Sequence, residues 1–302
     1  MALLDLMASR SIRSNGSPSM LMKALPFRSK RLQAVIGLLP ILCLAGCANV
    51  PLQQGTSLTS YQGLAAHKGL LTKAAMKADR DTLLEARTVR IVPTEFSPAA
   101  TTMIKEPKDL RLVANAIDRS LCVSLSDRLE VVGYGENADL TVHANITALV
   151  PTNVVASGVA VATSFGSSMV LPVSLPRIPL GLGGIAVEAE ALGTDGTQKA
   201  AMLWARGANS ITEKPRMSQV GDAYSLASKF GDDFAKLVVN GKSPFGRWPE
   251  VPSGQKIWST LGGKAKYAAC RTFGRAPGVA GLVTGKFGLP PGWSDRGAVS
   301  QR

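Results

Sequence analysis

Two segments of this chain carry the hydrophobic repeat of an amphipathic helix. Within residues 107–125, apolar side chains return at three- and four-residue steps, and Pro107 suits the first turn of a helix. A second apolar stripe runs from about Ser218 to Asn240, and Gly241 is a typical residue at a helix C-terminus. We predict one long helix over each segment.

Other segments show the two-residue alternation that is typical of β-strands. Over residues 140–150, apolar and polar side chains alternate without a break, which predicts a strand with one buried face. Residues 185–191 and 198–208 flank an Asp-Gly pair, which predicts a β-hairpin. Residues 88–96 form a further predicted strand, which Pro93 places at a sheet edge or a bulge.

This order of elements predicts an α+β domain over residues 61–242. We expect a small antiparallel or mixed sheet, with the two main helices packed on one of its faces. Residues 61–86 contain many Ala and Lys and favour one or two short helices. Residues 47–60 are small and polar and predict a flexible spacer. Residues 243–302 are rich in Gly and Pro, so we expect an irregular tail there.

Residues 1–46 have the organisation of a secretory signal peptide. Four basic side chains between residues 23 and 31 precede residues 32–46, which contain no charge. That apolar run is shorter than the ~20 residues that a membrane-spanning helix needs. Because signal peptides usually have about 15–30 residues, we expect translation to begin at Met20 or Met22.

The leader ends in Leu44-Ala45-Gly46-Cys47, which resembles the lipobox of bacterial lipoproteins. This resemblance implies that the leader is removed, that Cys47 is acylated, and that the lipid holds the mature chain on a membrane. The alternative is an ordinary signal peptide followed by an incidental cysteine. Ala48 comes next, where an Asp would resemble the inner-membrane retention signal of some bacteria, so we expect the periplasmic side of the outer membrane.

Several segments of the mature chain have distinctive sequences: SYQGL, ARTVRIVPTEF, ADLTVHANITALVPTN, GGIAVEAEALGTDGT and GDAYSLASKFGDDFAKLV. The most distinctive motif among them is GGxAxEAE before the Asp-Gly turn. Together these segments are similar to a proteobacterial lipoprotein family that is known only as a domain of unknown function. The resemblance covers about residues 60–242 and implies a fold and a location but no activity.

The positive charge of the mature chain is concentrated near its C-terminus. Residues 241–302 hold ten basic and two acidic side chains, whereas residues 47–240 hold equal numbers of each. An exported lipoprotein does not meet nucleic acid, so we expect anionic lipid, peptidoglycan or another envelope protein as its partner. Three tryptophans in this region indicate a contact with a membrane or a partner: Trp248, Trp258 and Trp293. The alternative is that they dock the tail on the domain.

The segment between two of the predicted strands is unusually apolar. Residues 140–176 contain no charged side chain, and residues 151–184 are long for a loop in a compact domain. One interpretation is a hairpin around Phe165 that contacts a membrane or a partner. The other is a flap over the core or a mobile loop.

Cys122 and Cys270 remain when Cys47 is acylated and the leader is removed. A disulfide between them suits an oxidising periplasm and would pin the tail to the domain. Connectivity cannot be read from cysteine spacing, so two unpaired thiols are the alternative.

Residues that suggest catalysis are few. His143 is predicted on the polar face of its strand, and Glu188 and Glu190 share a strand face; we interpret all three as solvated sheet residues. The chain has two histidines and no clustered Cys and His, so we expect no metal and no cofactor apart from the covalent lipid. The fingerprints of serine hydrolases, metalloproteases and nucleotide-binding enzymes are absent from the sequence.

We therefore expect a non-enzymatic lipoprotein that faces the periplasm. It would act as a scaffold or accessory factor in envelope assembly or transport. The alternative is an oligomeric export or pore component that inserts the 151–184 hairpin into the membrane. An enzyme that acts on envelope glycans is the third hypothesis.

Overall fold

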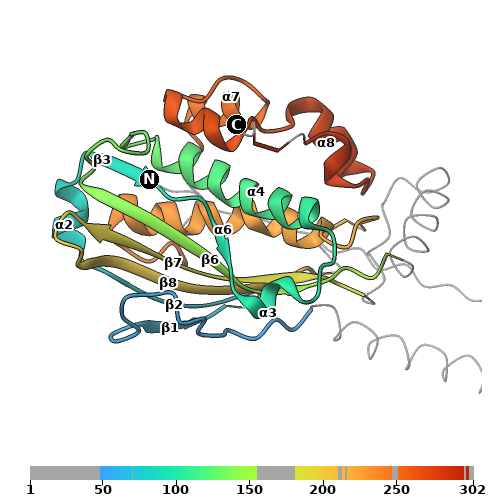
Figure 1. The fold of residues 1–302 in the computed structure, drawn as a ribbon, viewed down its shortest axis with the longest axis horizontal. Coiled ribbons are helices and arrows are strands. Elements are labelled where there is room, and N and C mark those ends of the chain that lie inside the picture. The colour runs from blue at the N-terminus through green and yellow to red at the C-terminus, as the bar shows by residue number, and fades with distance from the viewer. Residues whose placement is uncertain are drawn as a thin grey trace, which may run out of the picture. The chain divides into compact units, whose positions relative to one another are not determined.

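The chain folds around one open mixed sheet, which confirms the predicted α+β class (Figure 1). The structure is a computed structural model that describes residues 48–69, 71–154, 181–209, 213–214, 216–246, 251–295 and 297–298. Within these residues the strand order is β1-β2-β8-β7-β6-β3-β5, and β4 also pairs with β6. Cys47, Phe165 and Trp248, which the sequence singled out, lie outside the described residues.

Three long antiparallel strands form the middle of the sheet, as the alternating pattern predicts. They are β6 (Leu140–Val150), β7 (Gly184–Gly193) and β8 (Gln198–Gly207). β7 pairs with β6 on one side and with β8 on the other. The β7–β8 turn holds the expected Asp-Gly pair, and Gly196 takes a φ of 73°, a conformation that costs glycine little.

The segment before Ala86 forms an edge of this sheet and not the one or two helices that its composition favours. β1 (Ala65–Lys68) and β2 (Thr72–Ala78) make an antiparallel pair, and β2 continues the sheet alongside β8. Only α2 (Arg80–Glu85) is helical here. Ala and Lys are good helix formers, but the unpaired edge of β8 outweighs that local preference, because an edge strand leaves its backbone groups unbonded.

The opposite edge contains short strands that run parallel to their neighbours. The predicted strand over 88–96 is split into β3 (Thr88–Ile91) and β4 (Glu95–Phe96) around Pro93, and both pair with β6. α3 (Pro98–Thr101) follows, and β5 (Glu130–Val131) closes this side by pairing with β3.

Two long helices cover one face of the sheet, as predicted (Figure 1). They are α4 (Pro107–Leu125) and α6 (Gly221–Asn240), and they run in the same direction. Ser120 donates to the carbonyl of Ser228, and Ser124 one turn later donates to Asp232. The core beneath them is centred on the fully buried Trp204, whose ring meets Phe230 edge to face at 5.8 Å. Both helices therefore begin at the same end of the sheet.

Residues 48–64, which we call the N-terminal strap, lie along the other face of the sheet. The sequence suggested a flexible spacer over 47–60, but Val50 and Leu58 are buried against β7 and β8. This packing covers the sheet face on which β7 carries its glutamates, so β7 is buried on both sides. The difference from the expectation arises because buried carboxylates bind the polar strap, as described below.

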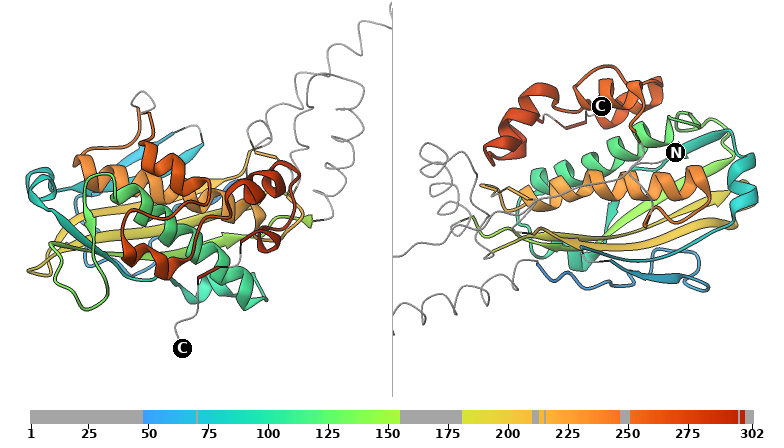
Figure 2. Two further views of the ribbon diagram at one scale, coloured as in Figure 1. Left: turned by 90° about the horizontal axis from the view of Figure 1, so that it is seen from above. Right: turned by 180° about the vertical axis from the view of Figure 1, so that it is seen from behind.

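Residues 251–298, which we call the C-terminal layer, pack outside α4 and make a third layer (Figures 1 and 2). The layer consists of short helices joined by turns, and the prediction of an irregular tail did not include these helices. These helices are α7 (Gly254–Thr260), η2 (Ala268–Phe273), α8 (Gly278–Lys286) and η3 (Pro291–Trp293). Among the helices of the described residues, none combines the length and apolar character needed to cross a bilayer.

Candidate functional site

The start of the N-terminal strap is fixed at one end of the sheet. The amide of Ala48 donates to the carbonyl of Ala208 at 3.0 Å, and the amide of Ala208 donates to the carbonyl of Gly183 at 2.8 Å. Gly207 lies so close that a Cβ atom there would sit 2.0 Å from the carbonyl oxygen of Ala48. We call this end, where β6 and β8 finish and β7 begins, the Ala48 end.

Glu188 on β7 holds the middle of the strap. Its fully buried carboxylate accepts hydrogen bonds from the amides of Gly55 and Ser57, each at 2.8 Å. The hydroxyls of Ser57 and Tyr61 donate to the same carboxylate at 2.5 and 2.9 Å. Four donors around one carboxylate satisfy both of its oxygens, and these hydrogen bonds offset the free-energy cost of burying the charge.

Glu190, two residues further along the same face, holds the next part of the strap. It accepts from the amide of Thr59 at 2.8 Å, from the Thr59 hydroxyl at 3.0 Å and from the side-chain amide of Gln198. The two glutamates do share one face, as predicted, but the expectation that they are solvated is wrong. The strap covers them, and their hydrogen-bonding capacity is used in binding it.

The Ala48 end also joins the sheet to the start of α6. The buried carboxylate of Asp222 accepts from the Thr152 hydroxyl at 2.9 Å and from the amide of Gly183 at 2.8 Å. The amide of Asn153 donates to the carbonyl of Gly181 at 2.9 Å. The two described ends of the apolar segment 151–184, residues 151–154 and 181–184, therefore both lie at this end. Residues 155–180 lie outside the described residues.

A cleft of about 1190 Å³ opens beside the first turns of α4. Lys108 and Arg111 line it from α4, Met217 from the segment before α6, and Trp293 from the C-terminal layer. Asp109 also lines it, and partial burial raises the pKa of that carboxyl above its usual value. The cleft thus brings cationic and large apolar side chains together at the Ala48 end.

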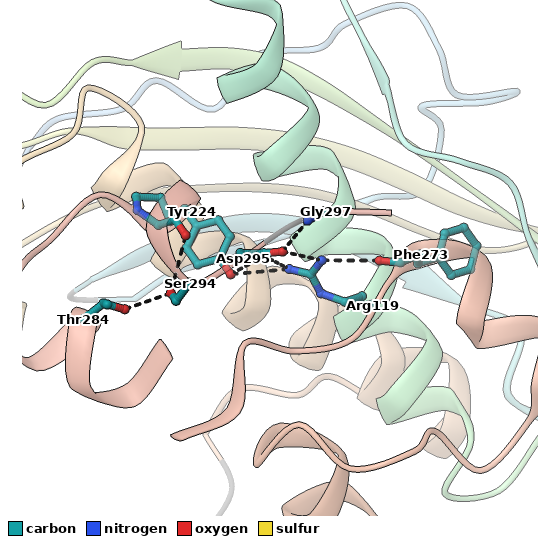
Figure 3. A network of polar contacts seen from close by, with 8 residues as sticks. Arg119, Tyr224, Phe273, Thr284, Ser294, Asp295 and Gly297 are labelled. Atoms are coloured by element: carbon teal, nitrogen blue, oxygen red, sulfur yellow. Dashed lines mark hydrogen bonds and ion pairs between the residues drawn. The ribbon is translucent and has the colours of Figure 1, made fainter. Parts of the chain in front are cut away.

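An ion-pair network behind this cleft attaches the C-terminal layer to the two long helices (Figure 3). Asp295 of the layer binds the Arg119 guanidinium of α4, and both side chains are almost completely buried. Tyr224 of α6 donates its hydroxyl to Asp295 at 2.6 Å, and burial raises the pKa of this phenol. Arg119 also donates to the carbonyl of Phe273 at 3.3 Å. One arginine therefore joins α4 to two separate parts of the layer.

The neighbouring residue on α4 faces the other way. Asp118 is buried against the loop between β3 and β4, where it accepts from the amide and the hydroxyl of Thr94 at 3.0 and 2.5 Å. Burial raises the pKa of Asp118 to about 7, because desolvation outweighs these hydrogen bonds and the nearby Arg119 charge. Asp118 thus binds the loop beside the sheet, whereas the next residue, Arg119, binds the C-terminal layer on the other side of α4.

A disulfide between Cys122 of α4 and Cys270 of η2 is the covalent connection to the C-terminal layer. It was one of the two arrangements that the sequence left open. Lys266 adds a hydrogen bond to the carbonyl of Ser126 at 2.9 Å, and Ser253 donates to Asp127 at 2.5 Å. These contacts gather around the C-terminal half of α4, away from the Ala48 end.

The aromatic residues that were selected from the tail lie in different places. Trp293 is 71% exposed at the rim of the cleft, whereas Trp258 is 59% exposed on α7, near the far end of α4. His143 is exposed on β6, as predicted. In the part of the chain that the structure describes, no group of three or more His, Cys, Asp or Glu side chains is placed to hold a metal ion.

The contacts that sequence reasoning missed are those that join distant parts of the chain. The GGxAxEAE motif pointed to Glu188 and Glu190 as distinctive, but alternation alone did not reveal what covers their face. No pattern in the sequence connects Arg119 with its partner Asp295, which lies 176 residues later in the chain. The available signal for that pair was that Asp295 is one of two acidic residues in a segment with ten basic ones.

The comparisons with known proteins identify a family and distant structural likenesses. Residues 53–234 match the family described as "Protein of unknown function (DUF3313)", and no curated protein matches the chain. The PelC dodecamer from Paraburkholderia phytofirmans covers 57% of this chain and 100% of its own, at 7% sequence identity and a TM-score of 0.35. A variant of that dodecamer covers 56% and 98%, at 10% identity and a TM-score of 0.31. At these TM-scores the likeness carries no inference about this chain.

Proposed function

The chain belongs to the family described as "Protein of unknown function (DUF3313)", and from this premise we propose a non-enzymatic lipoprotein on the periplasmic side of a bacterial outer membrane. Cys47 carries the lipid, and residues 1–46 are the leader that is removed. The folded part acts as a scaffold or accessory factor in envelope assembly or transport. Its partners are other envelope proteins, peptidoglycan or anionic lipid.

The observation that carries this proposal is the docking of Ala48. The residue directly after the lipobox cysteine is bound to the sheet through the hydrogen bond to Ala208, and the strap continues from it without a break. A lipid on residue 47 therefore attaches at a defined point of a rigid domain. Such an attachment suits a protein whose position on the membrane matters for what it binds.

The carboxylates support a structural role over a catalytic one. Glu188 and Glu190, the pair that suggested acid–base chemistry, are covered by the strap and occupied by its donors. Asp295 is occupied by Arg119 and Tyr224. A general acid or base needs access to its substrate, which these buried groups lack.

Labelling with a radioactive fatty acid tests the anchor. The wild type is expected to take up label, and Cys47→Ala is expected to take up none and to stay uncleaved or be released. Cys43→Ala, four residues earlier in the leader, is the matched control and keeps the label. Equal label in wild type and Cys47→Ala would falsify the anchor.

Fractionation of the envelope tests the location. The wild type is expected with the outer membrane, and Ala48→Asp is expected to move towards the inner membrane in a host that reads this signal. Crosslinking in intact cells then tests the scaffold role. If the chain, expressed at its native abundance, is recovered without any crosslinked envelope component, the result counts against the scaffold role.

A further inference from the structure

The Ala48 end carries more exposed apolar and cationic side chains than its role in packing requires. Val154 and Met217 are about a third exposed there, Val283 of α8 is 49% exposed, and Trp293 is 71% exposed. Lys108, Arg111 and Lys286 are exposed among them. Large apolar side chains rimmed by charge mark a surface that meets another body.

Contacts between distant segments place these residues at one end. Trp293, Met217, Val154, Lys108 and Arg111 line the same cleft. The amide of Met217 donates to the carbonyl of Gly288 at 2.7 Å, which brings the end of α8 to the start of α6. Figures 1 and 2 show α8 on the side of the molecule where α4 and α6 begin.

From this arrangement we propose that the Ala48 end rests directly on an anionic phospholipid bilayer, with Trp293 and the end of α8 at the interface and Lys108 and Arg111 at the head groups. The inference rests on the proposed lipid anchor. Successive Cα atoms lie about 3.8 Å apart, so a lipid on residue 47 brings the bilayer within one residue of Ala48. The strap leaves no spacer between them, because Ala48 is already hydrogen-bonded to the sheet.

The chemistry of the surface selects lipid over a protein partner. Tryptophan favours the boundary between hydrocarbon and water, and Lys and Arg favour anionic head groups. The buried acids of this end are already paired: Asp295 with Arg119, and Asp222 with Thr152 and Gly183. Glu106, directly before α4, and Asp109 of α4 reduce the positive charge locally, so the attraction depends on Lys108, Arg111 and Lys286 together.

Vesicle binding by the mature chain without lipid tests this proposal separately from the anchor. The protein is the mature chain with Cys47→Ser, exported so that its disulfide forms. We expect it to sediment with vesicles of phosphatidylglycerol and phosphatidylethanolamine and not with phosphatidylcholine alone. Each cationic side chain near an anionic surface strengthens binding about fivefold, so Lys108→Glu with Arg111→Glu is expected to weaken it by at least ~25-fold.

Brominated lipids provide a second measurement that depends on position. They quench a tryptophan at the interface, so Trp293→Phe is expected to lose most of the quenching. Trp258→Phe is the matched control, because it removes a tryptophan of similar exposure at the far end of α4. This variant is expected to keep the quenching. Trp293→Ala is expected to weaken vesicle binding about tenfold, as for the loss of one interfacial aromatic side chain.

Several results would overturn the proposal. Equal binding to neutral and anionic vesicles, or equal quenching in both tryptophan variants, excludes this surface as the contact. Stable dimers that form without lipid and are disrupted by Trp293→Ala assign the surface to a second copy of the chain. Fatty-acid label on Cys47 together with absent vesicle binding leaves the anchor intact and rejects the direct contact.

Discussion

The N-terminal strap and the C-terminal layer both cover the central fold, but they are held by different chemistry. The strap binds through backbone amides and hydroxyls that converge on Glu188 and Glu190, and residues 48–64 contain no cysteine that could form a disulfide with the sheet. The layer is held by the Cys122–Cys270 disulfide and the buried pair of Arg119 with Asp295. The family match covers residues 53–234, which include most of the strap and none of the layer.

This difference follows from how much apolar surface each region buries. Val50 and Leu58 of the strap lie on the sheet, whose face supplies a ready hydrophobic surface. The layer buries few large side chains, chiefly Phe273 beside the bridge, while much of α8 stays exposed. A segment with so little core needs a covalent or ionic attachment to stay folded. The C-terminal layer is therefore attached to the domain mainly by its disulfide and its buried ion pair.

Removal of the disulfide should have the largest effect. The bridge joins residues 148 apart, and for such a loop the chain-entropy model gives about 4–5 kcal/mol. We expect the double variant Cys122→Ala with Cys270→Ala to lose roughly this much unfolding free energy in urea. Protease should cut its layer first and leave the strap protected. A variant as stable and as resistant as the wild type would show that polar contacts alone hold the layer.

Loss of Glu188 should release the strap instead. Glu188→Ala leaves two amides and two hydroxyls of the strap without their acceptor, which is expected to cost about 3–4 kcal/mol of unfolding free energy. A protease of broad specificity should then cut between Ala48 and Leu64 while the layer stays protected. Glu130→Ala, at an exposed position of β5, is the control and should change neither property.

Asp295→Asn should weaken the layer by a smaller amount. The substitution leaves the Arg119 guanidinium buried without its counter-charge but keeps the shape of the site. We expect a loss of about 2–3 kcal/mol in unfolding free energy, with the disulfide still closed. Protease cleavage after residue 280 should increase, whereas the strap should not become more sensitive. An unchanged cleavage pattern would mean that the bridge alone positions this part of the layer.

Asp118 should give the smallest effect, a dependence of stability on pH. Its folded pKa of about 7 lies above the usual value of 3.8, so the folded state holds the proton more tightly than the unfolded state. Its contribution is complete below about pH 4 and is lost as the pH rises through 7. At ~1.4 kcal/mol per pH unit, unfolding free energy should fall by about 2 kcal/mol between pH 5 and 7.

Asp118→Asn isolates this contribution from the other carboxyls. Burial also raises the pKa of Asp233, which acts with the same sign and remains in the variant. We expect the fall between pH 5 and 7 to become markedly shallower in Asp118→Asn. Parallel slopes in Asp118→Asn and wild type would contradict the assignment.

The parts of the fold that sequence could predict are those with a strong local period. The helices over 107–125 and 221–240 and the strand over 140–150 each repeat their pattern over several turns or pairs. β1 and β2 were missed because local composition favours helix, and only pairing with β8 decides otherwise. The strap was missed because its binding depends on acceptors that lie more than 125 residues later.

The order of synthesis gives the Ala48 hydrogen bond a further consequence. Its acceptor is the carbonyl of Ala208, so 160 residues must follow Ala48 before the contact can form. Glu188 likewise appears 133 residues after Gly55. Contacts between such distant residues form late, because closing a long loop costs entropy before any bond repays it. The N-terminal strap is made before the strands that bind it, and it is thus among the last segments to reach its place in the fold.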